Sequence, residues 1–292
     1  MHEAPEPIDH VERWRRIVSA RREQHDAACA AQNRTTDDYW ARRAESFRAF
    51  VRLAARAVDP LVASVRKQLR AEDTVLDIGA GTGRHAIALA PHAQRVIALD
   101  PSPAMLAFLR EDAEAASLDN IDVIEGGWPD ASGETPEADI VISANVLYPI
   151  EDVVPFLVAM DGHARRLCFL QLMARQPWFD PPGLWQAVHG DPRQPQPAYL
   201  EAVNLLHQLG CYANVEIAWT DIPRTFDSLD VAVERFSEAV AVGDDEARRA
   251  RLRASLEETL ETREDGTLAL AAERFPQATV WWQAGALRDA AG

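Results

Sequence analysis

A run of alternating glycines, with an acidic residue on each side, is the part of this sequence best suited to holding a ligand. Val75-Leu76-Asp77-Ile78 is an apolar run that contains an acid; Gly79-Ala80-Gly81-Thr82-Gly83 follows, and then an alanine-rich stretch from Arg84 to Ala90. This pattern predicts a buried strand, a tight turn and a helix N-terminus, whose free N–H groups can hold a nucleotide-like ligand. A second acid, Asp100, ends the next apolar run.

Two classes of cofactor site use such a loop, and the residues favour one of them. The dinucleotide pattern G-x-G-x-x-G/A, counted from Gly79, requires a small residue where Arg84 stands. Counted from Gly81, Ala86 fits, but that register begins two residues after the predicted strand ends. Asp77 would also repel a pyrophosphate, whereas it can pair with a cationic amino group. A cofactor that carries an amino group is therefore favoured over a dinucleotide.

The run from Asp77 to Gly83 resembles motif I of the class I S-adenosylmethionine-dependent methyltransferases, without a mismatch. The resemblance implies S-adenosylmethionine as cofactor, S-adenosylhomocysteine as product, and pairing of Asp77 with the cofactor's amino group. Asp100 would bind both ribose hydroxyls, and the run that begins at Asp100 would place Met105 beside adenine. The cofactor-binding residues expected on this basis are Asp77, Gly79, Ala80, Gly81, Gly83, Asp100, Pro101, Met105, Gly127, Trp128, Asn145, Tyr39 and Arg43.

One departure from the family pattern concerns the adenine side of the site. The family usually has an acid after the third strand that recognises the adenine amino group, but here Glu125 is followed by Gly126-Gly127-Trp128. Trp128 could stack on adenine, with a backbone amide near it or Asp130 supplying a polar contact. The alternative is that Trp128 packs beneath the loop.

The acceptor side is expected to involve Asn145, Tyr148 and His189. Asn145 and Tyr148 follow a predicted strand at 139–143, in a run that resembles motif IV of the small-molecule branch of the family. His189 is the candidate general base, since it lies in an aromatic, proline-rich insertion at 174–198 that should cover the acceptor. Tyr148 could instead pack against the following helix. Likewise, three aromatic residues of the insertion could line a pocket or simply anchor it: Trp178, Phe179 and Trp185.

The N-terminal region offers a further cofactor contact. Tyr39 and Arg43 lie in a predicted helix that, in several family members, closes over the cofactor and approaches its carboxylate. As a plain amphipathic helix, the same residues would form part of the core and a solvated face.

Strand and helix patterns alternate from 74 to 171, which predicts repeated βα units and a parallel sheet. The expected fold is α/β: a Rossmann-like, doubly wound, seven-stranded sheet with an antiparallel last strand, an N-terminal helical cap and helical insertions. Residues 1–70 would form the cap or lid, and residues 71–292 the methyltransferase domain, with insertions at about 174–198 and 226–275. Strands are expected near 74–78, 95–99, 121–125, 139–143, 166–171, 213–219 and 279–283, and late helices near 228–240 and 244–263.

Composition limits the partners that we expect. The net charge is −16, with 46 acids against 30 Lys and Arg, so a nucleic acid partner is disfavoured. Cys29, Cys168 and Cys211 have no paired spacing, which argues against disulfides or a zinc site and favours a reducing cytoplasm. Residues 1–7 do not resemble a signal peptide, and the sequence has no apolar run long enough to span a bilayer. We expect a soluble cytoplasmic protein with no membrane partner, for which a homodimer is allowed.

The leading hypothesis is a methyltransferase that moves a methyl group by in-line displacement to O, N or S of a small organic acceptor, without a metal. The absence of an Asn/Asp-Pro-Pro-aromatic motif after 139–143 argues against exocyclic amines of nucleobases or glutamine as acceptors. Three alternatives stay open: an RNA or protein methyltransferase, a nicotinamide-dependent oxidoreductase, and a non-catalytic S-adenosylmethionine-binding protein.

Overall fold

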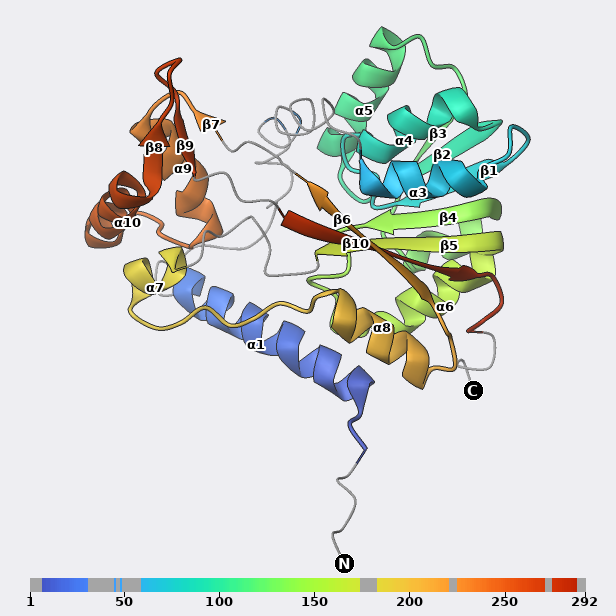
Figure 1. The fold of residues 1–292 in the computed structure, drawn as a ribbon, viewed down its shortest axis with the longest axis horizontal. Coiled ribbons are helices and arrows are strands. Elements are labelled where there is room, and N and C mark those ends of the chain that lie inside the picture. The colour runs from blue at the N-terminus through green and yellow to red at the C-terminus, as the bar shows by residue number, and fades with distance from the viewer. Residues whose placement is uncertain are drawn as a thin grey trace, which may run out of the picture.

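A seven-stranded sheet dominates the computed structural model, which describes residues 7–30, 45, 48, 59–173, 183–220, 225–270 and 275–287 (Figure 1). The strand order is β3-β2-β1-β4-β5-β10-β6. β1 to β5 pair in parallel, and β10 lies antiparallel to both β5 and β6. The predicted fold class and its antiparallel last strand are thereby confirmed. The strands are β1 (Thr74–Ile78), β2 (Arg95–Asp100), β3 (Ile121–Glu125), β4 (Ala138–Ala144), β5 (Ala164–Met173), β6 (Asn214–Thr220) and β10 (Phe275–Gln283).

The sheet is covered by helices on both faces, which explains why its central strands are continuous apolar runs. Leu76 and Ile78 face a core shared with α1 (His10–Ala30), α6 (Val153–His163) and α8 (Tyr199–Gln208). Val75 faces the opposite core, which lies beneath α3 (Pro60–Gln68), α4 (Arg84–Leu89) and α5 (Pro103–Ala115). Strand order reverses between β1 and β4, so a crevice opens at their carboxyl ends, where such sheets bind ligands.

Local capping fixes where two of the helices begin. The Asp59 carboxylate accepts hydrogen bonds from the Leu61 and Val62 N–H groups at the start of α3, at 2.9 and 3.3 Å. Ser102 caps α5 in the same way, by accepting from the Met105 N–H. Each helix then starts with a proline, whose missing N–H costs nothing in the first turn.

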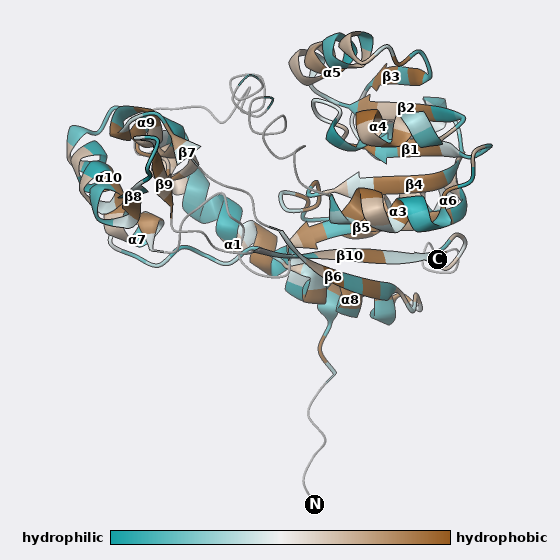
Figure 2. Ribbon diagram, turned by 45° about the horizontal axis from the view of Figure 1, so that its top comes forward, coloured by the Kyte–Doolittle hydropathy of each residue, from teal (hydrophilic) through white to brown (hydrophobic). Residues whose placement is uncertain are grey.

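A second lobe, with a core of its own, lies on the side toward which β4 and β5 point (Figures 1 and 2). It consists of α7 (Leu184–His189), α9 (Leu229–Ala239), α10 (Glu246–Thr259) and a small sheet of β7 (Thr225–Phe226), β8 (Leu260–Thr262) and β9 (Leu268–Leu270). The small sheet was not predicted. The predicted helix at 244–263 is six residues too long: α10 spans Glu246–Thr259, and residues 260–262 pair with β9 instead. Figure 2 shows α10 as largely hydrophilic, in keeping with its charged sequence.

The first helix contributes to both cores. Trp14 and Val18 are buried against the large sheet, whereas Ala28 and Cys29 are buried in the second lobe. The Trp14 Nε1–H donates a hydrogen bond to the Ile150 carbonyl oxygen at 2.8 Å. A cap that ends at residue 70 stays a prediction, since residues 31–44, 46, 47 and 49–58 lie outside the described ranges.

The outer strand of the large sheet has an apolar exposed face. Val215, Ile217 and Trp219 of β6 are 38%, 50% and 58% exposed. Apolar side chains on an open sheet edge are a common feature of protein contact surfaces. The homodimer stays a prediction.

Asp161 at the end of α6 fixes the last strand in its place between β5 and β6. Its buried carboxylate accepts hydrogen bonds from the Trp282 indole N–H at 2.9 Å and from the Gly285 and Leu287 backbone N–H groups at 3.0 and 3.1 Å. These bonds hold the turn that follows β10 against α6.

Asp161→Ala should lower the free energy of unfolding by about 2–4 kcal/mol, because three buried donors would lose a charged acceptor. Denaturant unfolding followed by tryptophan fluorescence measures the change. Asp161→Asn, which keeps one acceptor oxygen, should lose less. Equal stability of Asp161→Ala and the wild-type protein would show that the carboxylate does not hold the last strand.

Candidate functional site

The glycine loop lies at the carboxyl ends of β1 and β2 and is held by backbone hydrogen bonds. The Gly79 and Ala80 N–H groups both donate to the Leu99 carbonyl oxygen, at 2.8 and 3.0 Å. Gly79, Gly81 and Gly83 have φ angles of 74°, 55° and 88°, a region that favours glycine. A Cβ on Gly79 would lie 2.4 Å from a methyl carbon of Val146, so the loop also packs closely on the segment after β4.

Asp100 joins the end of β2 to the glycine loop. Its Oδ2 accepts from the Gly81 N–H at 2.8 Å, and its Oδ1 accepts from the Ser102 N–H at 2.9 Å. Burial raises the pKa of this carboxyl above its usual value, against the effect of the two amides. Each oxygen keeps a lone pair, so Asp100 has the capacity for the two hydroxyl hydrogen bonds expected of it.

Asp77 lies beneath the loop, where it is 1% exposed, and not on its open side. Neither carboxylate oxygen accepts a hydrogen bond of good geometry from a described residue. Burial raises the pKa of Asp77 to about 6; Asp100 and Asp59 add to this effect, whereas His85 and the Ala86 amide oppose it. A buried carboxylate without partners would gain from a cation bound nearby, so its charge fits the amino group of the expected cofactor. Direct contact between the two stays a prediction.

A group of charged residues that the sequence did not point to surrounds Asp59. The Arg84 Nη2 lies 2.6 Å from Asp59 Oδ2, and the His85 Nε2 lies 3.3 Å from the same oxygen. Although burial alone would raise the pKa of Asp59, His85 and Arg84 hold it well below its usual range. Arg84 and His85 begin α4, so this group links α3 to the first turn after the glycine loop.

Asn145 and Tyr148 come together at the end of β4. Asn145 has a left-handed backbone (φ 59°), which asparagine tolerates better than most residues. The Tyr148 hydroxyl donates to Asn145 Oδ1 at 3.2 Å and accepts from the Met173 N–H at 2.8 Å. Tyr148 is buried, and burial raises the pKa of its hydroxyl far above the usual value. The Asn145 Nδ2–H donates to Gln171 Oε1 at 3.4 Å; Gln171, 1% exposed, is a second residue that sequence reasoning missed.

Pro101, Met105 and Gly127 are the residues expected beside adenine. Of these, Met105 is buried near the start of α5. Trp128 is held from beneath: its indole N–H donates to the Phe156 carbonyl oxygen at 3.1 Å, and its ring meets the His163 ring edge-on at 4.8 Å. Of the two interpretations that the sequence left open, this geometry favours packing over stacking on adenine.

The structure does not bring His189 to Asn145 and Tyr148. Its Nε2 lies 2.6 Å from the Val240 carbonyl oxygen, and its ring stacks on Trp185 at 4.0 Å. Trp185 is buried in the second-lobe core, with the Arg193 guanidinium 3.6 Å from its ring centre. Trp185 therefore anchors the insertion and does not line a pocket at the end of β4. His189 belongs to the same lobe, because its neighbours Trp185 and Val240 both lie in that lobe's core.

Several expected residues lie outside the described residues: Tyr39, Arg43, Trp178 and Phe179. Arg48 of the same N-terminal segment is described. Its guanidinium donates to Glu111 and Asp112 of α5 and lies over the Phe108 ring at 4.4 Å. The N-terminal segment therefore contacts the helix that follows Asp100.

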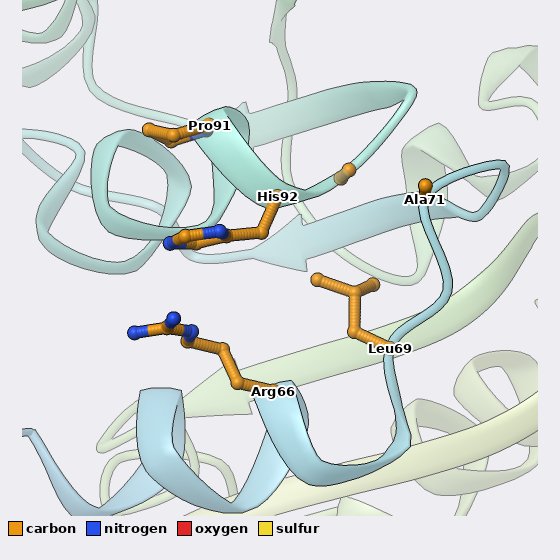
Figure 3. Close-up of a pocket in the computed structure, with 6 residues that line it drawn as sticks. Arg66, Leu69, Ala71, Pro91 and His92 are labelled. Carbon is orange, nitrogen blue, oxygen red and sulfur yellow. The ribbon is translucent and has the colours of Figure 1, made fainter.

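A surface pocket at the opposite edge of the sheet is not this site. It lies between the end of α3 and a short 3-10 helix, η1 (Ala90–His92), and Figure 3 shows the Arg66 and His92 side chains beside it. None of the expected site residues lines it.

In the described ranges we find no group of three or more His, Cys, Asp or Glu side chains that could hold a metal ion. None of the helices described combines the length and hydrophobicity of a bilayer span.

Comparisons with known proteins agree with the fold and with the family that the glycine loop resembles. Residues 75–165 match the family model described as "Methyltransferase domain". An uncharacterized Haemophilus influenzae protein is 28% identical over 52% of this chain and 56% of its own length. A Methanosarcina mazei protein named "Probable ribosomal RNA small subunit methyltransferase A" is 39% identical over 34% of each chain. The matches thus span about half and a third of these relatives. A solved Bacillus halodurans structure, provisionally named a methyltransferase, shares the fold (TM-score 0.50, 13% identity, 76% of this chain and 97% of that one).

Asp77→Asn should make the ligand-free protein more stable than the wild type at pH 7.5, by about 1–3 kcal/mol. The folded-state pKa of about 6 lies above the usual value of 3.8, so ionisation of Asp77 destabilises the wild-type fold increasingly between those pH values. Below about pH 4 both states are protonated and this difference should disappear.

Denaturant unfolding at pH 4.5, 6 and 7.5 measures this pH dependence. Asp139→Asn is the matched control. Hydrogen bonding from Arg165 lowers the pKa of Asp139, so loss of the Asp139 carboxylate should destabilise the protein, and more so at higher pH. A stability difference between Asp77→Asn and wild type that does not change with pH would contradict the raised pKa.

Proposed function

We propose that this chain, which contains a class I S-adenosylmethionine-dependent methyltransferase domain, transfers a methyl group to a small organic acceptor. The observation that carries the proposal is the contact between Asp100 and the Gly81 N–H at the carboxyl edge of β1 and β2. This contact supports the proposal because it joins the glycine loop to the carboxylate that we expect to accept the ribose hydroxyls of the cofactor.

The residues present fit that cofactor. Asp100 would bind the ribose hydroxyls with its free lone pairs. Gly79, Gly81 and Gly83 have no side chain and would let the backbone approach the cofactor closely, and Met105 would offer an apolar contact for the base. The charge of Asp77 would offset the cofactor's amino group from beneath the loop. When bound, the cofactor supplies an electrophilic methyl group on a sulfonium. Alignment of the acceptor with that methyl group is then the main task of the protein.

Asn145 and Tyr148 are suited to orienting groups and not to removing protons. Asn145 is an uncharged amide, and the pKa of the Tyr148 hydroxyl is raised by burial, so neither takes up a proton near neutral pH. We infer that Tyr148 positions Asn145, and that Asn145 faces the reacting groups. This arrangement favours an acceptor whose N, S or already ionised O atom carries a free lone pair.

RNA is the second candidate acceptor, since the Methanosarcina mazei protein that resembles this chain is named for ribosomal RNA. Charge argues against it: with a net charge of −16, the chain as a whole repels phosphates. A small molecule with little negative charge avoids this cost.

Calorimetry should detect binding of S-adenosylmethionine and S-adenosylhomocysteine and no binding of NADPH. The physical reason is that Asp77 and Asp100 place negative charge on both sides of the loop, where a pyrophosphate would otherwise lie. If NADPH alone bound, the methyltransferase proposal would be lost.

Acceptor class can be tested with methyl-labelled S-adenosylmethionine and a cell extract divided into small-molecule, RNA and protein fractions. Label should enter the small-molecule fraction only. Transfer to RNA that falls steeply with added salt would favour the second candidate.

Asp100→Ala should weaken S-adenosylhomocysteine binding by about 1.5–3 kcal/mol, roughly 10- to 150-fold, because the charged acceptor of the hydroxyls is lost. Asp139→Ala is the matched control. Asp139 also accepts a backbone N–H, that of Thr74 at 2.9 Å, but it lies at the amino end of β4. Its loss should leave the affinity unchanged. A folded Asp100→Ala protein with wild-type affinity would remove Asp100 from the site.

A further inference from the structure

Four hydrogen bonds in series join the end of β5 to the start of α3. The Met173 N–H donates to the Tyr148 hydroxyl at 2.8 Å, and that hydroxyl donates to Asn145 Oδ1 at 3.2 Å. The Asn145 Nδ2–H then donates to Gln171 Oε1 at 3.4 Å, and the Gln171 Nε2–H donates to Asp59 Oδ1 at 3.5 Å. We call this series the hydrogen-bond chain.

The four donors of the hydrogen-bond chain all point in the same direction along it. The chemistry of the groups at its two ends explains why. A backbone N–H can only donate, and an ionised carboxylate can only accept. Asp59 therefore requires the NH2 group of Gln171, which turns the Gln171 oxygen toward Asn145. That oxygen in turn requires the NH2 group of Asn145, which leaves Asn145 Oδ1 for the Tyr148 hydroxyl.

The carboxylate end of the hydrogen-bond chain stays ionised because Arg84 and His85 lie beside Asp59. Its Oδ2 lies 2.6 Å from the Arg84 Nη2 and 3.3 Å from the His85 Nε2, while its side chain is 11% exposed. His85 and Arg84 lower the pKa of Asp59 despite its burial. Asp59 is therefore an acceptor at every pH at which the protein is expected to work, and it cannot reverse the chain.

We propose that Asp59 and Gln171 are positioning residues that fix the orientation of the Asn145 amide at the reactive edge of the sheet. The inference rests on the proposed function in so far as Asn145 faces the reacting groups. Both positioning residues lie outside the 75–165 family match, whereas Asn145 and Tyr148 lie within it. The protein thus uses residues on either side of the 75–165 match to set one amide within it.

Fixing the amide matters because its two ends have opposite hydrogen-bonding character. Held as described, Asn145 still offers one Nδ2–H as a donor and one Oδ1 lone pair as an acceptor. Rotation by 180° would exchange these groups and present a donor where the ligand meets an acceptor. A buried carboxylate at a distance from the ligand thereby sets the polarity of the site without touching it.

The orientation of Asn145 can be observed directly in the ligand-free protein by NMR of its ¹⁵N-labelled side-chain amide. The resonance is assigned from its loss in Asn145→Ala. In Asp59→Asn the Gln171 amide is free to reverse, so the Asn145 resonance should shift or double. Asp73→Asn is the matched control, because Asp73 is also buried (3% exposed) and paired with an arginine, Arg166, but lies at the other edge of the sheet.

An unchanged Asn145 resonance in Asp59→Asn, or an equal change in Asp73→Asn, would overturn the proposal. If Asp59→Asn does not fold, Asp59→Ser replaces it. A serine hydroxyl still caps α3 but can donate as well as accept, so the same shift or doubling is expected.

The effect on the site is measured by S-adenosylhomocysteine affinity in a double-mutant cycle. Asp59→Asn and Gln171→Leu should each weaken binding roughly 3- to 10-fold, and the double variant should lose clearly less than the product of the two. Losses that multiply would mean that Asp59 acts independently of Gln171, against the proposal. Wild-type protein that fails to bind S-adenosylhomocysteine would refute the proposed function instead, and the NMR result would still decide the orientation of Asn145.

Discussion

The close approach of three backbone segments at the carboxyl edge of the sheet is the constraint on which the rest of the structure depends. The Leu99 carbonyl oxygen accepts two N–H groups of the glycine loop, and Val146 leaves no room for a Cβ at Gly79. The chain passes from strand to helix in this small space because residues of the connecting loop adopt positive φ, which glycine does at low cost. The same tightness brings the ends of β1, β2 and β4 together, and a ligand bound there meets residues from all three.

This arrangement buries the carboxyl groups of Asp59 and Asp77, and the surroundings of the two groups differ. Asp59 lies beside Arg84 and His85 and stays ionised, whereas Asp77 accepts no hydrogen bond of good geometry from a described residue and its pKa rises to about 6. An uncompensated buried acid destabilises a fold, but it also creates an environment that a cation would stabilise. Active sites commonly combine these properties, and the position of Asp77 beneath the glycine loop therefore supports a ligand site there.

The second lobe changes how the acceptor side is understood. β4 and β5 point toward it, but its aromatic residues pack within the lobe and against α1: Trp185 stacks on His189, Arg193 lies over the Trp185 ring and beside His25, and His189 contacts the Val240 carbonyl oxygen. Among the described residues, those at the end of β4 belong to β4, to β5 and to the segments next to them. Among these, Asn145 is held from both sides, by Tyr148 and by Gln171, which suits a site whose task is alignment.

The sequence by itself determined the sheet, the glycine loop and the place of Asp100, because these depend on local patterns: apolar runs of strand length, glycines in a turn, and an acid at a strand end. Only the tertiary structure decided which side chains meet. Asp59, Gln171 and Asn145 are far apart along the chain, and their types and spacing carry no signal of contact. His189 shows the converse, since its aromatic surroundings in the sequence suggested a roof over the acceptor, whereas packing in the second lobe places it elsewhere. Local pattern predicts an element and the face that it buries, but the partners of a polar side chain depend on how distant elements pack.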